Sequence, residues 1–181
     1  MSPILQKHNK VDLFLDNWVM IANPAAGGGH ARKAAERAAR FLERSGQPLD
    51  LRFTRASGHA GELAHQAVAD GAKRLIACGG DGTILELLPA LAHKSIALGL
   101  LPVGTSNDFA RGLGIPRRLG RALDILQHGQ VRNLDLGRIR DRLFCTVAAF
   151  GFDAEINHAV NSGRIPLSGT LGYIYAAFKH L

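Results

Sequence analysis

The chain has 181 residues, 46% hydrophobic and 20% charged, enough to bury the core of one domain or of one domain and part of another. Its formal net charge of +7 favours anionic partners such as nucleotides, nucleic acid or an acidic membrane face. Two cysteines exclude a disulfide framework and a cysteine zinc site. Because no leader and no run of 18 apolar residues is present, we expect a cytoplasmic protein, able at most to touch the inner membrane face.

Short apolar runs alternate with helical patterns through the first 130 residues. This alternation predicts an α/β fold, a mainly parallel sheet with flanking helices. Pro89 falls inside one expected helix and should kink or end it. The expected strands are 18–23, 48–54, 73–78 and 95–103, and the expected helices are 31–46, 57–71, 81–94, 106–114 and 116–129.

After residue 130 the pattern changes to two strand-like runs, 130–140 and 142–152, joined without a helix. They predict the first hairpin of an all-β second lobe, followed by a helix over 168–181. A lone hairpin has exposed edges, so we expect this second lobe to be incomplete within the chain. The predicted division is an N-terminal extension over 1–16, an α/β lobe over 17–130 and the start of a β-rich lobe over 131–181.

Four expected strands end in glycine-rich or hydroxyl-rich peptides: "NPAAGGG", "TRASGHA", "CGGDGT" and "PVGTSND". The carboxyl ends of parallel strands meet at one edge of a sheet, where ligands bind. Glycine allows a close backbone approach, and helix N-termini offer free N–H groups to phosphate. Singly, "GGG" or "SGHA" is as well explained by an ordinary turn or helix start. Together the four loops predict a phosphate-bearing ligand.

The peptide "CGGDGT" places Asp81 beside helix-start amides. A carboxylate there has a local role if it faces a cation, a hydrogen-bond donor or a reacting hydroxyl. The sequence contains no GxxxxGK[ST] and no GxGxxG after the first strand, so it is neither a P-loop enzyme nor a dinucleotide-binding protein of the common type. It also lacks the HRD and DFG motifs of protein kinases.

In their order, "NPAAGGG", Thr54, "GHAGELA", "GGDGTILE", "LPVGTSNDFAR" and "GFDAE" resemble the diacylglycerol kinase catalytic family, which includes bacterial lipid kinases and sphingosine kinases. NAD kinases resemble the chain at "GGDGT" but differ at "GTSNDFAR". The resemblance implies a nucleotide-binding lobe like those of NAD kinase and 6-phosphofructokinase. It also implies an ATP-dependent lipid kinase that transfers the γ-phosphoryl group to a lipid hydroxyl, with Mg²⁺ carried by ATP.

Residue by residue, the resemblance implies a catalytic role for Asp81, close to the metal or the acceptor hydroxyl. Glu86 could support the same corner or be an exposed helix acid. Asn107 and Asp108 brace the fourth loop or help to orient the metal-bound phosphates, or else they cap the turn that follows the loop. No metal ligand set is expected from the protein, and in the family the general base lies in the second lobe, beyond Leu181. The implied nucleotide-binding residues are Asn23, Pro24, Ala25, Ala26, Gly27, Thr54, Gly80, Asp81, Gly82, Thr83, Ile84, Leu85, Glu86 and Thr105.

The chain departs from the family at Pro89–Ala90, where Asn-Gly is usual, and at Thr146, where asparagine is usual. These departures keep open a non-catalytic nucleotide-binding module, with an NAD kinase-like enzyme as a further alternative. We expect the 181-residue chain alone to bind nucleotide with weak or no turnover.

Other partners follow from charge and composition. Aromatic residues are 6% and not interleaved with basic ones, so nucleic acid is not an expected partner. The sequence leaves the acceptor lipid and the oligomeric state open, a homodimer included. Four basic residues could face acidic lipid headgroups at a membrane surface or be solvated surface charge: Arg111, Arg117, Arg118 and Arg121.

Overall fold

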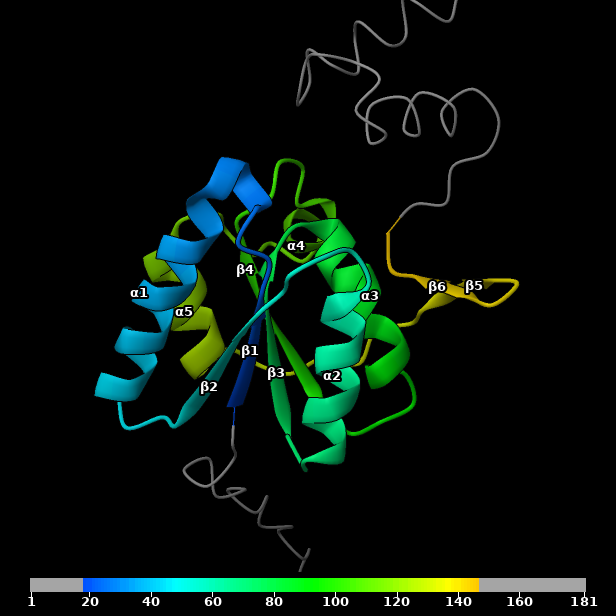
Figure 1. The fold of residues 1–181 in the computed structure, drawn as a ribbon, viewed down its shortest axis with the longest axis horizontal. Helices are drawn as coiled ribbons and strands as arrows, with labels where there is room; N and C mark the ends of the chain where they lie inside the picture. The colour runs from blue at the N-terminus through cyan, green and yellow to red at the C-terminus, as the bar shows by residue number, and fades with distance from the viewer. Residues whose placement is uncertain (1–17, 147–181) are drawn as a thin grey trace, which may run out of the picture.

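A computed structural model describes residues 18–146. Its central element is a four-stranded sheet in the order β2-β1-β3-β4, with every neighbouring pair parallel (Figure 1). The predicted α/β fold with a parallel sheet is therefore confirmed. The strands are β1 (Trp18–Ala22), β2 (Leu49–Phe53), β3 (Arg74–Gly79) and β4 (Ala97–Pro102).

Helices cover both faces of the sheet. Helices α1 and α5 lie on one face, and α2 and α3 lie on the other (Figure 1). The short α4 lies near the edge where the strands end. The bounds are η1 (Ala26–Gly29, a 3-10 turn), α1 (His30–Arg44), α2 (His59–Ala69), α3 (Asp81–Leu91), α4 (Asp108–Gly112) and α5 (Leu119–His128).

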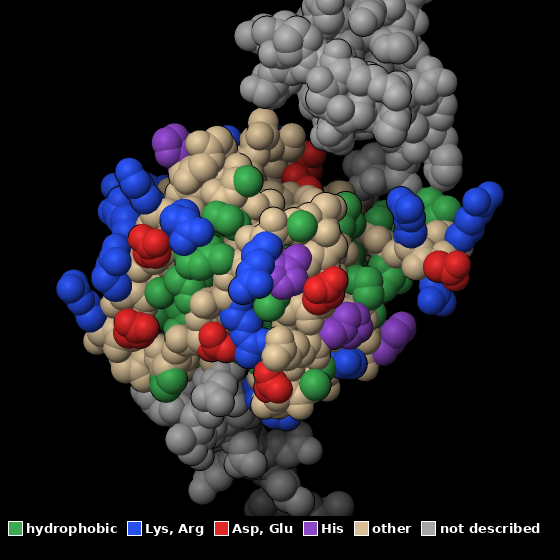
Figure 2. Space-filling view, in the orientation of Figure 1, with side chains coloured by type: hydrophobic (Ala, Val, Ile, Leu, Met, Phe, Trp, Pro, Cys, Tyr) green, Lys and Arg blue, Asp and Glu red, His purple; other side chains and the backbone are tan. Residues whose placement is uncertain are grey.

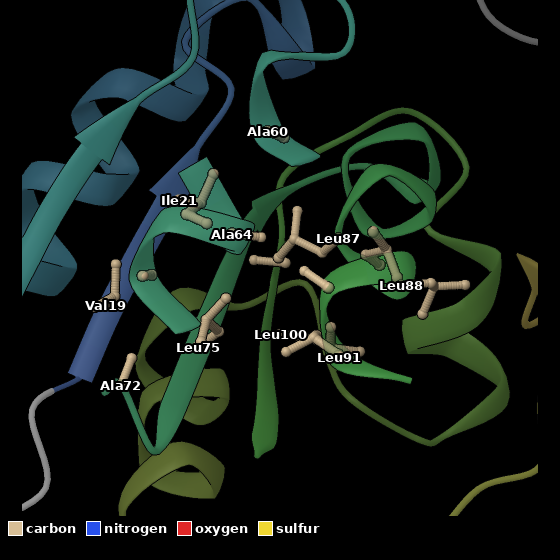
Figure 3. Packing of buried hydrophobic residues seen from close by; sticks show 14 of the residues in the cluster. Val19, Ile21, Ala60, Ala64, Ala72, Leu75, Leu87, Leu88, Leu91 and Leu100 are labelled. Carbon is tan, nitrogen blue, oxygen red and sulfur yellow. The ribbon is translucent and has the colours of Figure 1, made fainter. Parts of the chain in front are cut away.

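The central strand β1 is buried along its whole length, and its side chains alternate between two cores. Trp18 and Met20 pack in the core under α1 and α5. Val19 and Ile21 pack in the core under α2 and α3, with Leu87 of α3 (Figure 3). Because β1 and β3 are held from both faces, the loops that follow them start from a rigid position.

Each strand and helix expected before residue 130 is present, with ends shifted by a few residues. Helix α3 is not broken at Pro89; it runs two residues further, to Leu91. The N-cap of α2 is Gly58, at φ +84°, and not Ser57, the hydroxyl residue with which the expected helix begins. Within residues 18–146, no helix is long and apolar enough to cross a membrane.

The expected hairpin is present but short: β5 (Gly137–Ile139) pairs antiparallel with β6 (Arg142–Phe144). Gly137 lies beneath the Phe144 ring, which leaves no room for a β-carbon. The predicted boundary at residue 130 falls between α5 and β5 and stays a prediction. The expected extension over 1–16 and the expected helix over 168–181 lie outside the described residues.

Pro89 supplies a test of α3. Proline has no N–H for the carbonyl of Leu85, a loss of about 3 kcal/mol in a helix interior, partly offset by the stiffer unfolded chain. We expect Pro89→Ala to raise the free energy of unfolding by about 1–2 kcal/mol in urea titrations. Exposed Gln66 on α2 gives a matched control, and Gln66→Ala should stay within about 0.5 kcal/mol. A Pro89→Ala variant no more stable than this control would contradict the expectation.

Candidate functional site

Four loops follow the carboxyl ends of the four parallel strands, and all four lie at one edge of the sheet (Figure 1). Loop 1 is residues 23–29, loop 2 is 54–58, loop 3 is residue 80, which leads into α3, and loop 4 is 103–107. Backbone bonds join the first residues of three of the loops to neighbouring strands: Thr54 N–H donates to Ala22 O (2.9 Å), Asn23 N–H to Cys78 O (3.0 Å), and Val103 N–H to Gly79 O (3.0 Å). The structure thus brings together the four glycine-rich peptides singled out in the sequence.

Glycines let three of these loops touch through their backbones. Gly27 has φ +60°, and a β-carbon there would overlap the carbonyl oxygen of Val103, so loop 1 packs on loop 4. A β-carbon on Gly104 would overlap the Cα atom of Gly80, so loop 4 packs on loop 3. At both positions a larger residue would force the loops apart.

Asn107 holds loop 4 in shape. Its side chain is buried, its Nδ2 donates to Gly104 O (2.7 Å), and its Oδ1 accepts from Gly104 N–H (2.9 Å). The residue has φ +52° and stands at the N-cap of α4, yet its side chain makes no capping bond. These bonds bear out the brace and not the cap, and a role in orienting metal-bound phosphates stays a prediction.

Asp81, at the start of α3, caps the N-terminus of α4. Its Oδ2 accepts from Asp108 N–H and its Oδ1 from Phe109 N–H, each at 3.0 Å. Both carboxylate oxygens therefore have a backbone donor at the start of α4. The catalytic role near a metal or acceptor stays a prediction, and the bonds present show a residue that positions loop 4.

Glu86 is half-buried and contacts loop 2. Its Oε1 accepts from Gly58 N–H (2.9 Å) and its Oε2 from Ala60 N–H (3.1 Å). Neither earlier expectation holds, since the carboxylate neither supports the Asp81 corner nor lies free in solvent. Five residues of helix turn the side chain by about 140° around the axis, so Asp81 and Glu86 point to opposite neighbours.

The four helices that follow the loops now fall into two groups. Helices α2 and α4 have carboxylates from α3 at their N-termini. Helices α1 and α3 begin after Gly29 and Gly80, which have no side chain to cap them; α1 has no acidic residue in its first turn, whereas α3 has Asp81 there, with both oxygens bonded to α4. His30 N–H at the start of α1 is bonded to Ala26 O and Gly27 O. The next N–H groups of α1 and those of the first turn of α3 are the backbone donors of this edge that suit an anion.

The other residues predicted to bind nucleotide differ in their exposure and in their distance from the loops. Thr54 is buried at the start of loop 2, and Thr105 is exposed in loop 4. Asn23 Oδ1 accepts from Ala25 N–H (3.0 Å), which shapes the Asn23–Gly27 turn. The Ile84 side chain packs in the core and the Leu85 side chain is exposed, so neither is grouped with the loop residues.

Two thiols are held neutral by their surroundings. Burial raises the pKa of Cys78 to about 12. Burial, with a smaller contribution from the charge of Asp81, raises the pKa of Cys145 to about 11. Leu143 and Cys145 pack against the core that lies under α2 and α3, so the end of the hairpin lies against the α/β lobe, and exposed Thr146 follows it. Within 18–146, no three His, Cys, Asp or Glu side chains are grouped to hold a metal ion.

Sequence reasoning missed two arginine contacts that no local pattern signals. Arg117 Nη2 donates to Gly104 O (3.0 Å), and the Arg32 guanidinium lies 4.3 Å from the centroid of the Phe53 ring. Arg111 forms an ion pair with Asp108. Two of the four arginines considered for lipid headgroups are therefore bound locally. Positive side chains are also spread over α1 and the hairpin (Figure 2), the exposed ones on α1 being Arg32, Lys33, Arg37, Arg40 and Arg44.

Comparison with known proteins decides the family. The family model of the diacylglycerol kinase catalytic domain matches residues 17–139. The chain belongs to this family. Among curated relatives, a diacylglycerol kinase of Mycobacterium tuberculosis is 38% identical over 168 residues, 89% of this chain and 54% of that protein. A probable YegS-like lipid kinase of Chromohalobacter salexigens is 35% identical over 161 residues, 87% of this chain and 50% of that protein.

A solved structure agrees. The crystal structure of a diacylglycerol kinase from Bacillus anthracis matches with a TM-score of 0.62 and 27% identity, over 71% of this chain and 45% of that one. The diacylglycerol kinase-family chain described here thus has that fold, and it spans about half the length of the curated relatives it matches.

The close approach of loops 3 and 4 gives the test of this edge. In Gly104→Ala the new β-carbon would overlap Gly80, so we expect a loss of about 1–3 kcal/mol in the free energy of unfolding. The matched control is Gly112→Ala in α4, where a β-carbon meets nothing within 4 Å. The urea concentration at the midpoint of unfolding should be the same for this control as for wild type, or higher. Equal stability of the two variants would show that the loops are not in contact.

Proposed function

We propose that this chain is the ATP-binding part of a lipid kinase, which transfers the γ-phosphoryl group of ATP to the hydroxyl of a diacylglycerol-like or sphingoid lipid. One observation carries the proposal. At the loop edge, carboxylates of α3 bond to the N-termini of α2 and α4, whereas α1 and α3 start after glycines and have no side-chain cap. Family membership gives the reaction class.

The uncapped starts suit a phosphate chain. Gly28, Gly29 and Gly82 each have open space where a β-carbon would lie, so phosphate oxygens can approach the backbone there. The partial positive charges of α1 and α3 act on the same ligand, and the protein carries a formal +7. Neutralising phosphate charge in this way is what phosphoryl transfer requires of the protein.

Magnesium would come with ATP, held mainly by phosphate oxygens, and would supply further charge neutralisation. Asp81 is the acidic residue in the first turn of α3, and its oxygens are occupied by backbone donors. Asp81 would therefore act chiefly by holding α4, and with it loop 4, in register with α3. Thr105 in loop 4 and the Asn23–Gly27 turn would contact the nucleotide, with Thr54 reaching it through its hydroxyl.

The lipid side of the reaction rests on the family alone. Residues 131–181 would begin the β-rich lobe that binds the lipid, and the general base would come from that lobe. Arg118 and Arg121 are exposed, and they could meet acidic headgroups while the protein works at the cytoplasmic face of the membrane.

Gly82 separates nucleotide binding from stability. A β-carbon at this position in α3 meets nothing within 4 Å, so Gly82→Ala should fold at least as well as wild type. The same methyl group would occupy space next to the uncapped amides. We expect the Kd for Mg·ATP to rise about tenfold, or about 1.4 kcal/mol, in calorimetry. Gly112→Ala should leave the Kd unchanged, and an unchanged Kd in Gly82→Ala would contradict the placement of the phosphates.

The reaction itself is tested with the intact gene product, labelled ATP, Mg²⁺ and vesicles containing diacylglycerol or sphingosine. We expect label in the lipid fraction. ATP binding without labelled lipid would favour the non-catalytic module, and label in NADP, when NAD is offered, would favour an NAD kinase-like enzyme. The 181-residue chain assayed alone should bind ATP with little or no turnover.

A further inference from the structure

We propose that Glu86 is a positioning residue that fixes loop 2 to α3 and does so without touching the nucleotide. The proposal rests on the proposed function in one respect only, that loop 2 is part of a nucleotide site. It replaces the direct nucleotide contact that the resemblance implies for Glu86.

The contacts of Glu86 use both carboxylate oxygens. Oε1 accepts from Gly58 N–H (2.9 Å), with Ser57 Oγ at 3.5 Å, and Oε2 accepts from Ala60 N–H (3.1 Å). Gly58 is the N-cap of α2 and has no side chain of its own to satisfy these donors. Glu86 therefore supplies, from another helix, the cap that α2 lacks.

The backbone around Glu86 has little freedom to move. A β-carbon on Gly61 of α2 would lie 2.9 Å from the Glu86 carbonyl oxygen, so the two helices pack backbone to backbone. The next residue, Leu87, is fully buried in the core between α2, α3 and the sheet (Figure 3). The position of loop 2 is thereby set by the position of α3.

Loop 2 is closed further by its own residues. Arg55 N–H donates to His59 Nδ1 (3.0 Å), and Thr54 N–H donates to Ala22 O (2.9 Å). Loop 2 is thus held by β1 at its first residue, Thr54, and by Glu86 at its last residue, Gly58. Since α3 begins at the uncapped amides, Glu86 sets the spacing between Thr54 and the phosphate-binding end of α3.

Amide hydrogen exchange of the ligand-free chain, followed by NMR, tests the contact itself. Glu86→Ala removes both acceptors, so exchange at Gly58 and Ala60 should become at least tenfold faster. Glu86→Gln keeps one acceptor oxygen and should give an intermediate rate, which keeps the test sound if the alanine variant folds poorly. Exchange at Asp108 and Phe109, held by Asp81, should not change in either variant.

Glu62 gives the matched control, because it is an exposed acid in the first turn of the same helix. Glu62→Gln should leave exchange at Gly58 and Ala60 within twofold of wild type. Unchanged exchange in Glu86→Ala, or an equal increase in Glu62→Gln, would overturn the proposal.

Mg·ATP separates positioning from direct contact. In the wild-type chain, saturating Mg·ATP should leave Gly58 and Ala60 as protected as before, because Glu86 stays on loop 2. Faster exchange on ATP addition would show that Glu86 moves to the nucleotide. We expect the Kd for Mg·ATP to rise several-fold in Glu86→Gln and more in Glu86→Ala, and to stay unchanged in Glu62→Gln. An unchanged Kd in Glu86→Ala would overturn the positioning role. A wild-type chain that binds no ATP would defeat the proposed function. The hydrogen-exchange rates of the ligand-free chain would still show whether Glu86 holds the amides of Gly58 and Ala60.

Discussion

The loop edge depends on two carboxylates that leave α3 in different directions. Asp81 bonds to the start of α4 on one side, and Glu86 bonds to the start of α2 on the other. Each oxygen accepts from a backbone N–H group, and charged acceptors make such bonds stronger than neutral ones. Helix α3 is itself fixed by Leu87 and Ile84 in the core. The two neighbouring helices are therefore positioned from one buried element.

This arrangement separates positive charge that is satisfied within the protein from charge that is offered to a ligand. A helix N-terminus carries roughly half a unit charge, and a carboxylate placed there neutralises most of its attraction for other anions. Helices α2 and α4 are in that state, and α3 carries Asp81 in its own first turn, with both oxygens bonded to α4. Helix α1 starts after Gly29, without a capping side chain and without an acidic residue in its first turn. Among the helices that follow the four loops, α1 is therefore the one whose N-terminal charge is least neutralised by acidic side chains, which fits the phosphate chain proposed above.

The fold followed from the sequence because it depends on local periodicity. The short apolar run of β1 and the apolar face of α1 are visible within a few residues, and their outcome is a buried strand and a packed helix. The candidate site could be predicted from the sequence only in part. Glycine loops at the ends of parallel strands must share an edge, but Glu86 lies 26 residues beyond Ala60 and Arg117 lies 13 beyond Gly104. No propensity or spacing rule predicts which backbone donor a side chain will reach over such separations.

The same geometry explains why Pro89 need not disturb the site. A proline withdraws a bond from the carbonyl four residues earlier, which here is Leu85, and its effect is confined to the turn around that bond. Asp81 caps α4 from the first turn of α3, and Gly80, which contacts Gly104 of loop 4, precedes that helix; both lie before the turn that contains Pro89. Glu86 faces α2, which packs against α3 at Gly61, so its backbone is held from outside the helix. The departure from Asn-Gly at Pro89–Ala90 is therefore compatible with nucleotide binding, whether the intact protein is a kinase or a non-catalytic nucleotide-binding module.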